Sequence, residues 1–193
     1  MSEEELDGAR ILERMRLKNL AGKKNLIEDL KKRKSQRSVS LLVEMLQDES
    51  WYLREQAVQA LSDAGDDAKE PVLQVLEDGL WYARAAAAKV LGRIGGSEAV
   101  GRLTDCLLDS NMTVQGAAAA ALVDIARSSS VEDLASPLAS RSHDVKQKAV
   151  ACLRLLDKEI ADGVVGCWER AIALPESEKT PKPGPSEEDK AER

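Results

Sequence analysis

Apolar residues recur at helical spacing in two stretches of the chain that are close copies of each other. Residues 48–65 and residues 78–95 both contain Trp-Tyr-x-Arg, followed by an Ala- and Leu-containing segment and a glycine. Two weaker copies follow. Self-similarity at a fixed short period predicts a stack of helix pairs, each of which buries its apolar face against its neighbours. The copies are anchored, at spacings of 30, 31 and 31 residues, on Trp51, Trp81, Met112 and His143.

Each repeat is expected to contain two helices. The first helices are predicted near residues 39–47, 71–77, 100–108 and 131–139, and the second near 51–64, 81–94, 112–126 and 143–156. Pro71 is placed in the first turn of its helix, where the missing N–H costs nothing. Pro137 falls late in its helix, which should be short or kinked there. The expected N-caps of second helices are Ser50, Asn111 and Ser142, with Leu80 at the equivalent position of the second repeat.

Alignment of the second helices predicts which positions form the core. Apolar residues at i, i+4, i+8 and i+11 form one stripe along each helix. One position of the stripe is alanine in all four repeats, which indicates a helix contact too close for a larger side chain. The predicted core consists of Leu53, Ala83, Val114 and Val145; Ala57, Ala87, Ala118 and Ala149; Leu61, Leu91, Leu122 and Leu153; and Ala64, Ile94, Ile125 and Leu156.

The two ends of the chain depart from this pattern. Residues 1–37 are interpreted as a degenerate, basic capping repeat, with helical patterns over 5–20 and up to 34 that are separated by a break at Ala21-Gly22. Residues 175–193 contain four prolines and a run of Glu and Lys, which predicts a disordered tail. Between the ends, four repeats are placed at 38–66, 67–97, 98–128 and 129–157, and a closing helix at 158–174.

The net charge of −6 is unevenly distributed. Residues 8–37 carry eleven bases and three acids, so a basic end joins an acidic body. A run such as Lys31-Lys32-Arg33-Lys34 can contact the phosphates of a nucleic acid. No aromatic side chains are interleaved with this run, and we interpret it as a solvated capping face, with nucleic acid as the less favoured partner.

Composition also bears on location and on metal chemistry. The first residues lack the features of a secretory signal, and no apolar run approaches membrane-spanning length, so no membrane is expected as a partner. The three cysteines, Cys106, Cys152 and Cys167, show no Cys-x-x-Cys and are expected to be buried thiols of a reduced, cytoplasmic protein. His143 is the only histidine, so neither a metal site nor a cofactor is predicted.

The best-preserved repeat carries a resemblance to a known family. Asp78, Arg84 and the run Leu91-Gly92-Arg93-Ile94-Gly95 resemble the short HEAT-like repeats of the phycobilisome-lyase type, over about residues 38–157. The resemblance implies an all-α fold, an α-solenoid in which antiparallel helix pairs form a right-handed superhelix, as in HEAT and armadillo proteins. It also implies that the second helices line the concave side. The family contains both lyases and adaptors, so the resemblance is specific for the fold and weak for function.

An acid and a base recur at one place in the first two repeats, with weaker counterparts at the same place in the third and fourth. Because an active site is needed once and a structural device in every repeat, we interpret the recurrence as structural. The resemblance implies a ladder in which the Asp of the turn meets the Arg of the second helix and holds neighbouring repeats in register. Ser142-His143-Asp144 is interpreted as a helix start, and no catalytic residue is assigned. The recurring pairs are Asp48/Arg54, Asp78/Arg84, Asp109/Gln115 and Ser140/Lys146.

The aromatic pairs and the small residues of the second helices are the candidate binding features. Trp51 and Trp81 are expected to fill the turn between two helices, whereas Tyr52 and Tyr82 are open to either a structural or a partner-binding role. Alanine and glycine at non-core positions predict a groove floor that another backbone can approach closely. The predicted partner-binding residues are Tyr52, Arg54, Tyr82, Arg84, Ala85, Ala88, Lys89, Gln115, Ala119 and Lys146.

The function predicted from the sequence is therefore a non-catalytic protein–protein interaction or scaffold module. The expected partner is a peptide or helix, with acidic residues that face the Arg and Lys of the groove. A tetrapyrrole-lyase subunit and a nucleic-acid accessory protein are the alternatives. The identity of the partner and the oligomeric state stay open.

Overall fold

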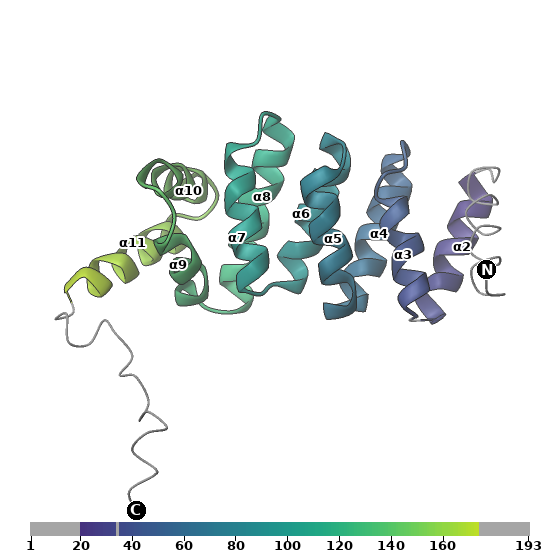
Figure 1. Cartoon of the computed structure of the whole chain (residues 1–193), viewed down its shortest axis with the longest axis horizontal. Helices are drawn as coiled ribbons and strands as arrows, with labels where there is room; N and C mark the ends of the chain where they lie inside the picture. The colour runs from purple at the N-terminus through teal and green to yellow at the C-terminus, as the bar shows by residue number, and fades with distance from the viewer. Residues whose placement is uncertain (1–19, 34, 174–193) are drawn as a thin grey trace, which may run out of the picture.

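The computed structural model describes residues 20–33 and 35–173, and this part of the chain consists of helices joined by short turns, without a strand. Figure 1 shows the helices in an elongated row, with α3, α5 and α7 in front of α4, α6 and α8. Each helix pair packs on the next, so the predicted all-α solenoid is confirmed. The elements are α2 (Leu20–Arg33), α3 (Gln36–Met45), α4 (Trp51–Ala64), α5 (Asp66–Asp78), α6 (Trp81–Ile94), α7 (Ser97–Asp105), the 3₁₀ turn η1 (Cys106–Leu108), α8 (Met112–Ser128), α9 (Val131–Ala139), α10 (His143–Leu156) and α11 (Lys158–Ala173).

The predicted second helices are confirmed. Of the first helices, α9 has the predicted bounds, and α3, α5 and α7 begin three to five residues earlier than predicted. Helices α4, α6 and α10 have the predicted bounds, and α8 extends to Ser128. Helix α5 begins at Asp66, so the placement of Pro71 in a first turn is wrong. Asp66 and Asp67 interact favourably with the N-terminal end of the helix dipole. Gly65, at φ 64°, turns the chain immediately before them.

The predicted break at Ala21-Gly22 is wrong. Helix α2 begins at Leu20 and continues through both residues. A glycine inside a helix costs only about 1 kcal/mol, and burial of Ile27 and Leu30 on the same helix outweighs that cost. The helix predicted over residues 5–20 and the disordered tail predicted over 175–193 lie, apart from Leu20, outside the described residues.

Only one of the three predicted N-caps makes the expected side-chain hydrogen bond. The Asn111 side chain accepts a bond from the Thr113 N–H at 2.9 Å. Ser50 and Ser142 occupy cap positions without such a bond. At Ser50, the backbone N–H of the cap residue itself donates to the Asp48 carboxylate at 2.9 Å.

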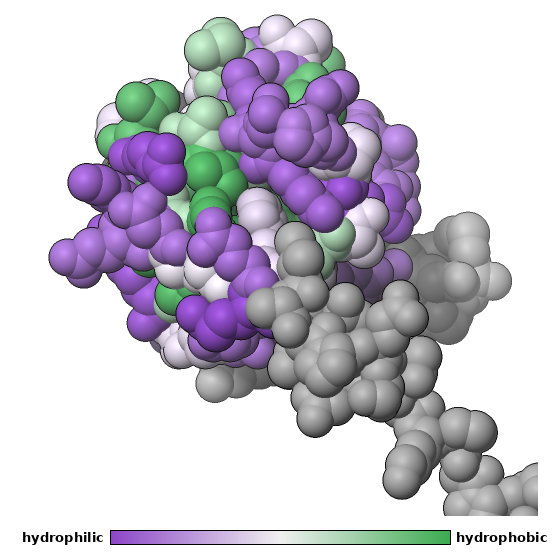
Figure 2. All heavy atoms as spheres, turned by 90° about the vertical axis from the view of Figure 1, so that its left-hand side faces the viewer, coloured by the Kyte–Doolittle hydropathy of each residue, from purple (hydrophilic) through white to green (hydrophobic). Residues whose placement is uncertain are grey.

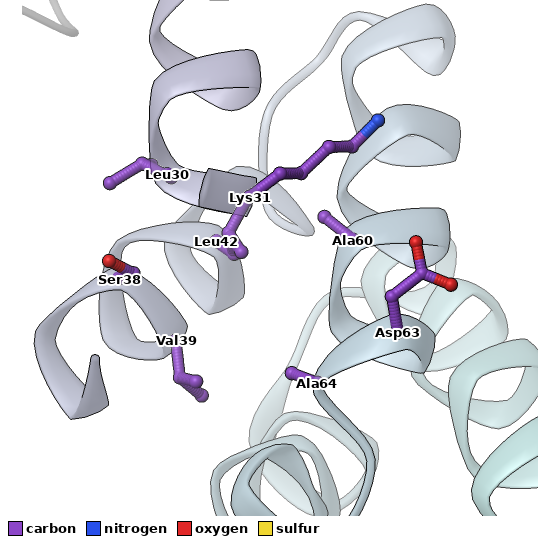
Figure 3. Close-up of a pocket in the computed structure, with 8 residues that line it drawn as sticks. All are labelled: Leu30, Lys31, Ser38, Val39, Leu42, Ala60, Asp63 and Ala64. Carbon is purple, nitrogen blue, oxygen red and sulfur yellow. The ribbon is translucent and has the colours of Figure 1, made fainter. Parts of the chain in front are cut away.

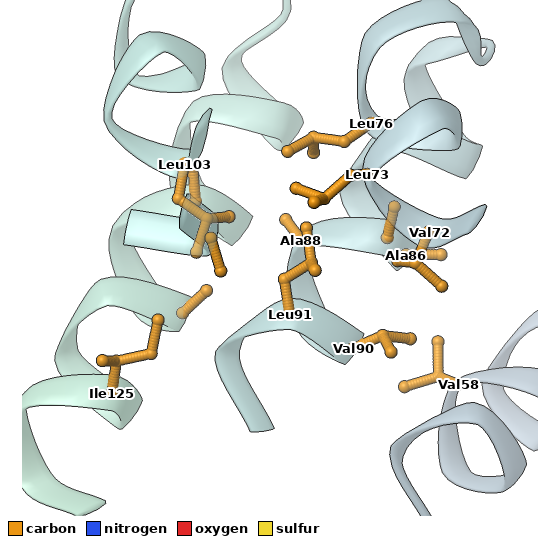
Figure 4. Close-up of a cluster of buried hydrophobic side chains, with 14 of the residues drawn as sticks. Val58, Val72, Leu73, Leu76, Ala86, Ala88, Val90, Leu91, Leu103 and Ile125 are labelled. Atoms are coloured by element: carbon orange, nitrogen blue, oxygen red, sulfur yellow. The ribbon is translucent and has the colours of Figure 1, made fainter. Parts of the chain in front are cut away.

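The predicted core is observed almost throughout. The whole alanine column and the whole Leu61 column are fully buried. Figure 4 shows the centre of this core, where Val72, Leu73 and Leu76 face Ala88 and Leu91 on one side of a layer that continues to Leu103 and Ile125. The exceptions are Val145, Ala64 and Ile94, which are partly exposed, and Leu156, which is 51 % exposed. Leu156 ends α10, where α11 follows in place of another repeat and no further second helix covers this position.

The fourth repeat is turned relative to the others. Figure 1 shows α10 end-on, whereas α4, α6 and α8 lie upright, and α11 runs across the end of the stack. The regular row of second helices therefore extends from α4 to α8. Beyond it, α10 and α11 form a differently oriented end.

Candidate protein-interaction surface

The small residues predicted to floor a groove are buried between helices. Ala88 is fully buried, and Ala85 and Ala119 are 7 % and 4 % exposed. A Cβ atom on Gly92 would lie 2.8 Å from the Cα and Cβ of Ala121. In a row of adjacent helices, each second helix is covered by its own first helix and by two neighbouring second helices, so only a narrow strip reaches solvent. These alanines cannot contact a partner, and the predicted groove floor is wrong.

The exposed strip of the second helices is polar and internally bonded. The Lys89 ammonium donates to the Glu55 carboxylate at 2.9 Å, and the Arg93 guanidinium donates to the Gln59 side chain at 3.2 Å. Both bonds join α4 to α6. Lys89 is thus exposed as predicted, but its charge is already paired. This face therefore offers an acidic partner no apolar surface to pack on, and Lys89 offers it no unpaired positive charge.

The recurring Asp and Arg form cross-repeat contacts with a different pairing from the predicted one. The Arg84 guanidinium binds both carboxylate oxygens of Asp109, at 3.0 and 2.8 Å, and also donates to the Gly79 carbonyl at 2.9 Å. Lys23 and Asp48 form the equivalent ion pair two repeats earlier along the stack. In both pairs the carboxylate lies 25 residues after the base, in the next repeat. The ladder therefore ties α6 to the turn before α8, and α2 to the turn before α4.

Within a repeat, the side chain at the recurring Arg or Gln position contacts the backbone of its own turn. Arg54 donates to the carbonyls of Asp48 and Glu49, at 2.7 and 2.9 Å, and Gln115 donates to the carbonyl of Asp109 at 2.6 Å. Arg54, Arg84 and Gln115, all predicted to bind a partner, thus have internal structural roles. Asp78 is excluded from the ladder because α5 continues to this residue, whose carboxylate accepts from Gln74.

Both ladder carboxylates are held in the ionised form. Burial opposes ionisation of Asp109, but hydrogen bonds from Arg84 and from the Asn111 backbone outweigh it and keep the pKa of Asp109 below the ordinary 3.8. The same balance, with Lys23 and the Ser50 backbone as donors, lowers the pKa of Asp48. Since the folded state lowers these pKa values, the pairs stabilise the fold above the ordinary Asp pKa, and that stability is lost as the pH falls through the folded-state values.

We expect Asp109→Asn to lower the free energy of unfolding at pH 7 by about 1–2 kcal/mol, because charge-assisted bonds to Arg84 become neutral ones. Urea denaturation at pH 7 and at pH 3 measures the effect. The wild type should lose stability between the two pH values more steeply than the variant. Asp63→Asn, on an exposed carboxylate of α4, is the control. Equal pH dependence of Asp109→Asn and the wild type would show that the pair does not stabilise the fold.

The two tryptophans are exposed, so the prediction that they fill the turns is wrong. Trp51 is 71 % and Trp81 47 % exposed, each with the following tyrosine edge-on at 6.1 and 5.6 Å between ring centroids. Tyr52 and Tyr82, in contrast, are partly buried and pack against the core. The Arg54 guanidinium lies 4.7 Å from the centroid of the Tyr82 ring, and the Tyr82 hydroxyl donates to the Gln47 carbonyl at 3.4 Å. Tyr82 therefore joins two repeats, and the tryptophans project outward.

The exposed tryptophans belong to a row of apolar side chains at the N-terminal ends of α4, α6 and α8. Five of the seven large apolar side chains that the described residues expose lie in this row. The contacts of Tyr82 with Arg54 and Gln47, and of Arg84 with Asp109, place these helix ends beside one another. We call this row the apolar ridge: Trp51 (71 % exposed), Leu80 (58 %), Trp81 (47 %), Leu108 (55 %) and Met112 (76 %).

Other features of the described residues bear on catalysis and metal binding. Burial, together with the charges of Asp109 and Asp105, raises the pKa of the Cys106 thiol to about 11, so this cysteine stays protonated and unreactive. No group of three or more His, Cys, Asp or Glu side chains in this part of the chain could hold a metal ion. His143 is exposed and bonded to Gln147. A cavity of about 310 Å³ lies between α2, α3 and α4. Figure 3 shows its lining, in which the apolar Leu30, Val39, Leu42, Ala60 and Ala64 are accompanied by the polar Lys31, Ser38 and Asp63.

Comparison with known proteins identifies the family. Residues 9–80 and 69–154 match the family model of HEAT repeats, so the chain belongs to the HEAT-repeat family. No curated protein matches the chain. Among solved structures, an engineered protein is 19 % identical over 89 % of this chain and 90 % of its own, but the TM-score of 0.37 is too low to support an inference. None of the helices in the described ranges has the length and apolar character needed to span a membrane.

Proposed function

We propose that this HEAT-repeat chain is a non-catalytic protein-binding scaffold that holds its partner along the apolar ridge. The observation that carries the proposal is the register of the exposed side chains: the same corner of three successive repeats presents large apolar groups to solvent. Contiguous exposed apolar patches typically mark interaction sites. Tryptophan contributes most strongly among side chains to binding energy at protein interfaces.

The charges beside the ridge indicate the chemistry of the partner. Glu49 lies two residues before Trp51, and Asp78 two residues before Leu80, and both carboxylates are exposed. A complementary segment carries apolar side chains interleaved with Lys or Arg, which can pair with these carboxylates. The same carboxylates disfavour an anionic membrane surface, so a protein partner is the better fit.

The two alternative functions have no support of this kind. Membership of the short lyase-type subclass stays a prediction, and the described residues offer no feature that selects a tetrapyrrole. Of the basic segment, the described Lys23 and Lys31 are paired with Asp48 and Glu28. A nucleic-acid function is therefore not proposed.

Affinity capture from the native cell tests the ridge. We expect the wild-type chain to retain a partner that the Trp51→Ser/Trp81→Ser variant loses, because the two largest apolar groups of the surface are removed. Leu156→Ser is the matched control, since Leu156 is 51 % exposed at the end of α10, an exposure close to that of Trp81, and lies outside the ridge. Thermal unfolding should be nearly unchanged in both variants. Retention of the same partner by the double variant would refute the proposal.

A further inference from the structure

A second surface lies at the C-terminal end of the stack, between α10 and α11. The two helices enclose a groove of about 540 Å³, a volume in the range of ligand and peptide pockets. Figure 2 faces this end of the molecule and shows hydrophobic atoms between hydrophilic side chains. The groove is lined by His143, Lys146, Gln147, Val150, Ala151, Arg154, Val165 and Trp168.

The walls of the groove are fixed by contacts within the protein. The Trp168 indole N–H donates to the carbonyl of Ala135 on α9 at 2.9 Å, which sets the orientation of the ring. The ammonium of Lys146, on α10, lies 5.7 Å from the centroid of the Trp168 ring, on α11. Arg154 on α10 binds Asp162 on α11 at 2.8 Å. An occupant therefore meets a preformed surface and pays little entropy to order it.

The chemistry of the groove is apolar at the floor and cationic at the rim. Val150, Ala151, Val165 and Trp168 are the apolar lining residues, and no carboxylate is among the eight lining residues. The Lys146 ammonium has no ion pair with a carboxylate in the described part of the chain; its contact is the Trp168 ring. Such a surface complements an apolar side chain with negative charge beside it.

The apolar surface continues past the groove along α10. Leu155 is 88 % exposed and lies one helical turn after Ala151, on the same side of the helix. An occupant that covers both the groove and Leu155 must extend along the helix. This length favours a peptide segment over a small molecule.

We propose that the α10–α11 groove binds an acidic protein segment, in which an apolar anchor side chain is flanked by carboxylates. The anchor packs on Trp168 and Val150, and a carboxylate lies against Lys146, whose charge is not paired with a carboxylate of the described residues. The segment continues over Leu155. This site is separate from the apolar ridge and takes a partner segment of opposite charge, so it does not depend on the proposed function of the ridge.

The probe for this site is a display library of random twelve-residue peptides, selected on the full-length chain. We expect the enriched peptides to combine one or two large apolar residues with Asp or Glu. Fluorescence anisotropy with the best peptide then measures affinity for two groove variants: Ala151→Trp, which fills the groove from an exposed position, and Lys146→Glu, which reverses the rim charge. Each should weaken binding at least about 10-fold, the effect of losing roughly 1.4 kcal/mol.

Two controls separate this site from other surfaces. Lys158→Glu reverses an exposed base at the start of α11 outside the groove lining, and Trp51→Ser/Trp81→Ser removes the ridge; both should bind the peptide as the wild type does. Far-UV circular dichroism confirms that each variant is folded. Absence of any enriched peptide, enrichment of basic peptides, or binding that Lys146→Glu leaves unchanged would overturn the proposal.

Discussion

Replacing Gly92 with alanine is expected to lower the free energy of unfolding by about 1–3 kcal/mol. Gly92 is buried in α6 where this helix packs on α8, and an added Cβ atom would lie 2.8 Å from the Cα and Cβ of Ala121. One of these contacts is with the α8 backbone, which cannot give way as a flexible side chain could. The two helices must therefore separate, and the alanine contacts along the same interface weaken with them.

Gly116 is the matched control for Gly92. It lies inside α8, and a Cβ atom added there meets nothing within 4 Å. Gly116→Ala should raise the free energy of unfolding by about 0.5–1 kcal/mol, because alanine loses less conformational entropy in a helix. Urea denaturation of both variants measures the difference. Effects of the same sign would contradict the close α6–α8 contact.

The second large effect is expected for Leu122→Ala. Leu122 is fully buried in α8, in the leucine column that runs through all four repeats. Truncation removes apolar burial and leaves a cavity, which together cost about 2–5 kcal/mol. In a solenoid, stability is close to a sum of repeat and interface contributions, so no central core compensates for the loss.

Leu155→Ala provides the comparison for Leu122→Ala. Leu155 is 88 % exposed, and its truncation should change stability by less than about 0.5 kcal/mol. Chemical denaturation followed by circular dichroism measures both variants. A loss at Leu122 no greater than that at Leu155 would mean that the leucine column is not the core.

The sequence was sufficient to predict the helix pairs and their core. The four second helices were predicted closely because a 3.6-residue apolar period and a repeat of 30 or 31 residues agree with each other. The alanine that recurs at one position of all four second helices predicted the close helix contact. The prediction that Leu156 is buried was wrong, because an alignment across repeats assumes that another repeat follows, and α11 does not cover this position.

The candidate site was harder to predict than the fold. Alanine, as at Ala88 and Ala119, occurs both on exposed helix surfaces and at close helix contacts. The sequence of one helix does not show which of its sides the neighbouring helices cover. Spacing within one repeat likewise paired Asp48 with Arg54, whereas the carboxylate that binds Arg84 comes from the next repeat. A partner 25 residues away carries no local signal.

The outward position of the tryptophans also required the structure. In each Trp-Tyr pair, one aromatic ring lies toward the neighbouring repeat and the other lies away from it. Burial propensity alone favours the tryptophan, the larger of the two, as the buried ring. The contacts of Tyr82 with Arg54 and Gln47 show the reverse arrangement. With the tyrosine on the inner side, the repeat period predicts an exposed row at Trp51, Trp81 and Met112.

Site-specific photo-crosslinking tests the central claim most directly. A photoreactive amino acid is placed in turn at the positions of Trp51, Trp81 and Met112, and, as controls, at the exposed Asp63 and Asp124 near the other ends of α4 and α8. After irradiation in the native cell, the three ridge positions should cross-link the same partner, and the two control positions should not. Cross-links from positions 63 and 124, with none from the ridge, would contradict the assignment of the apolar ridge as the docking surface.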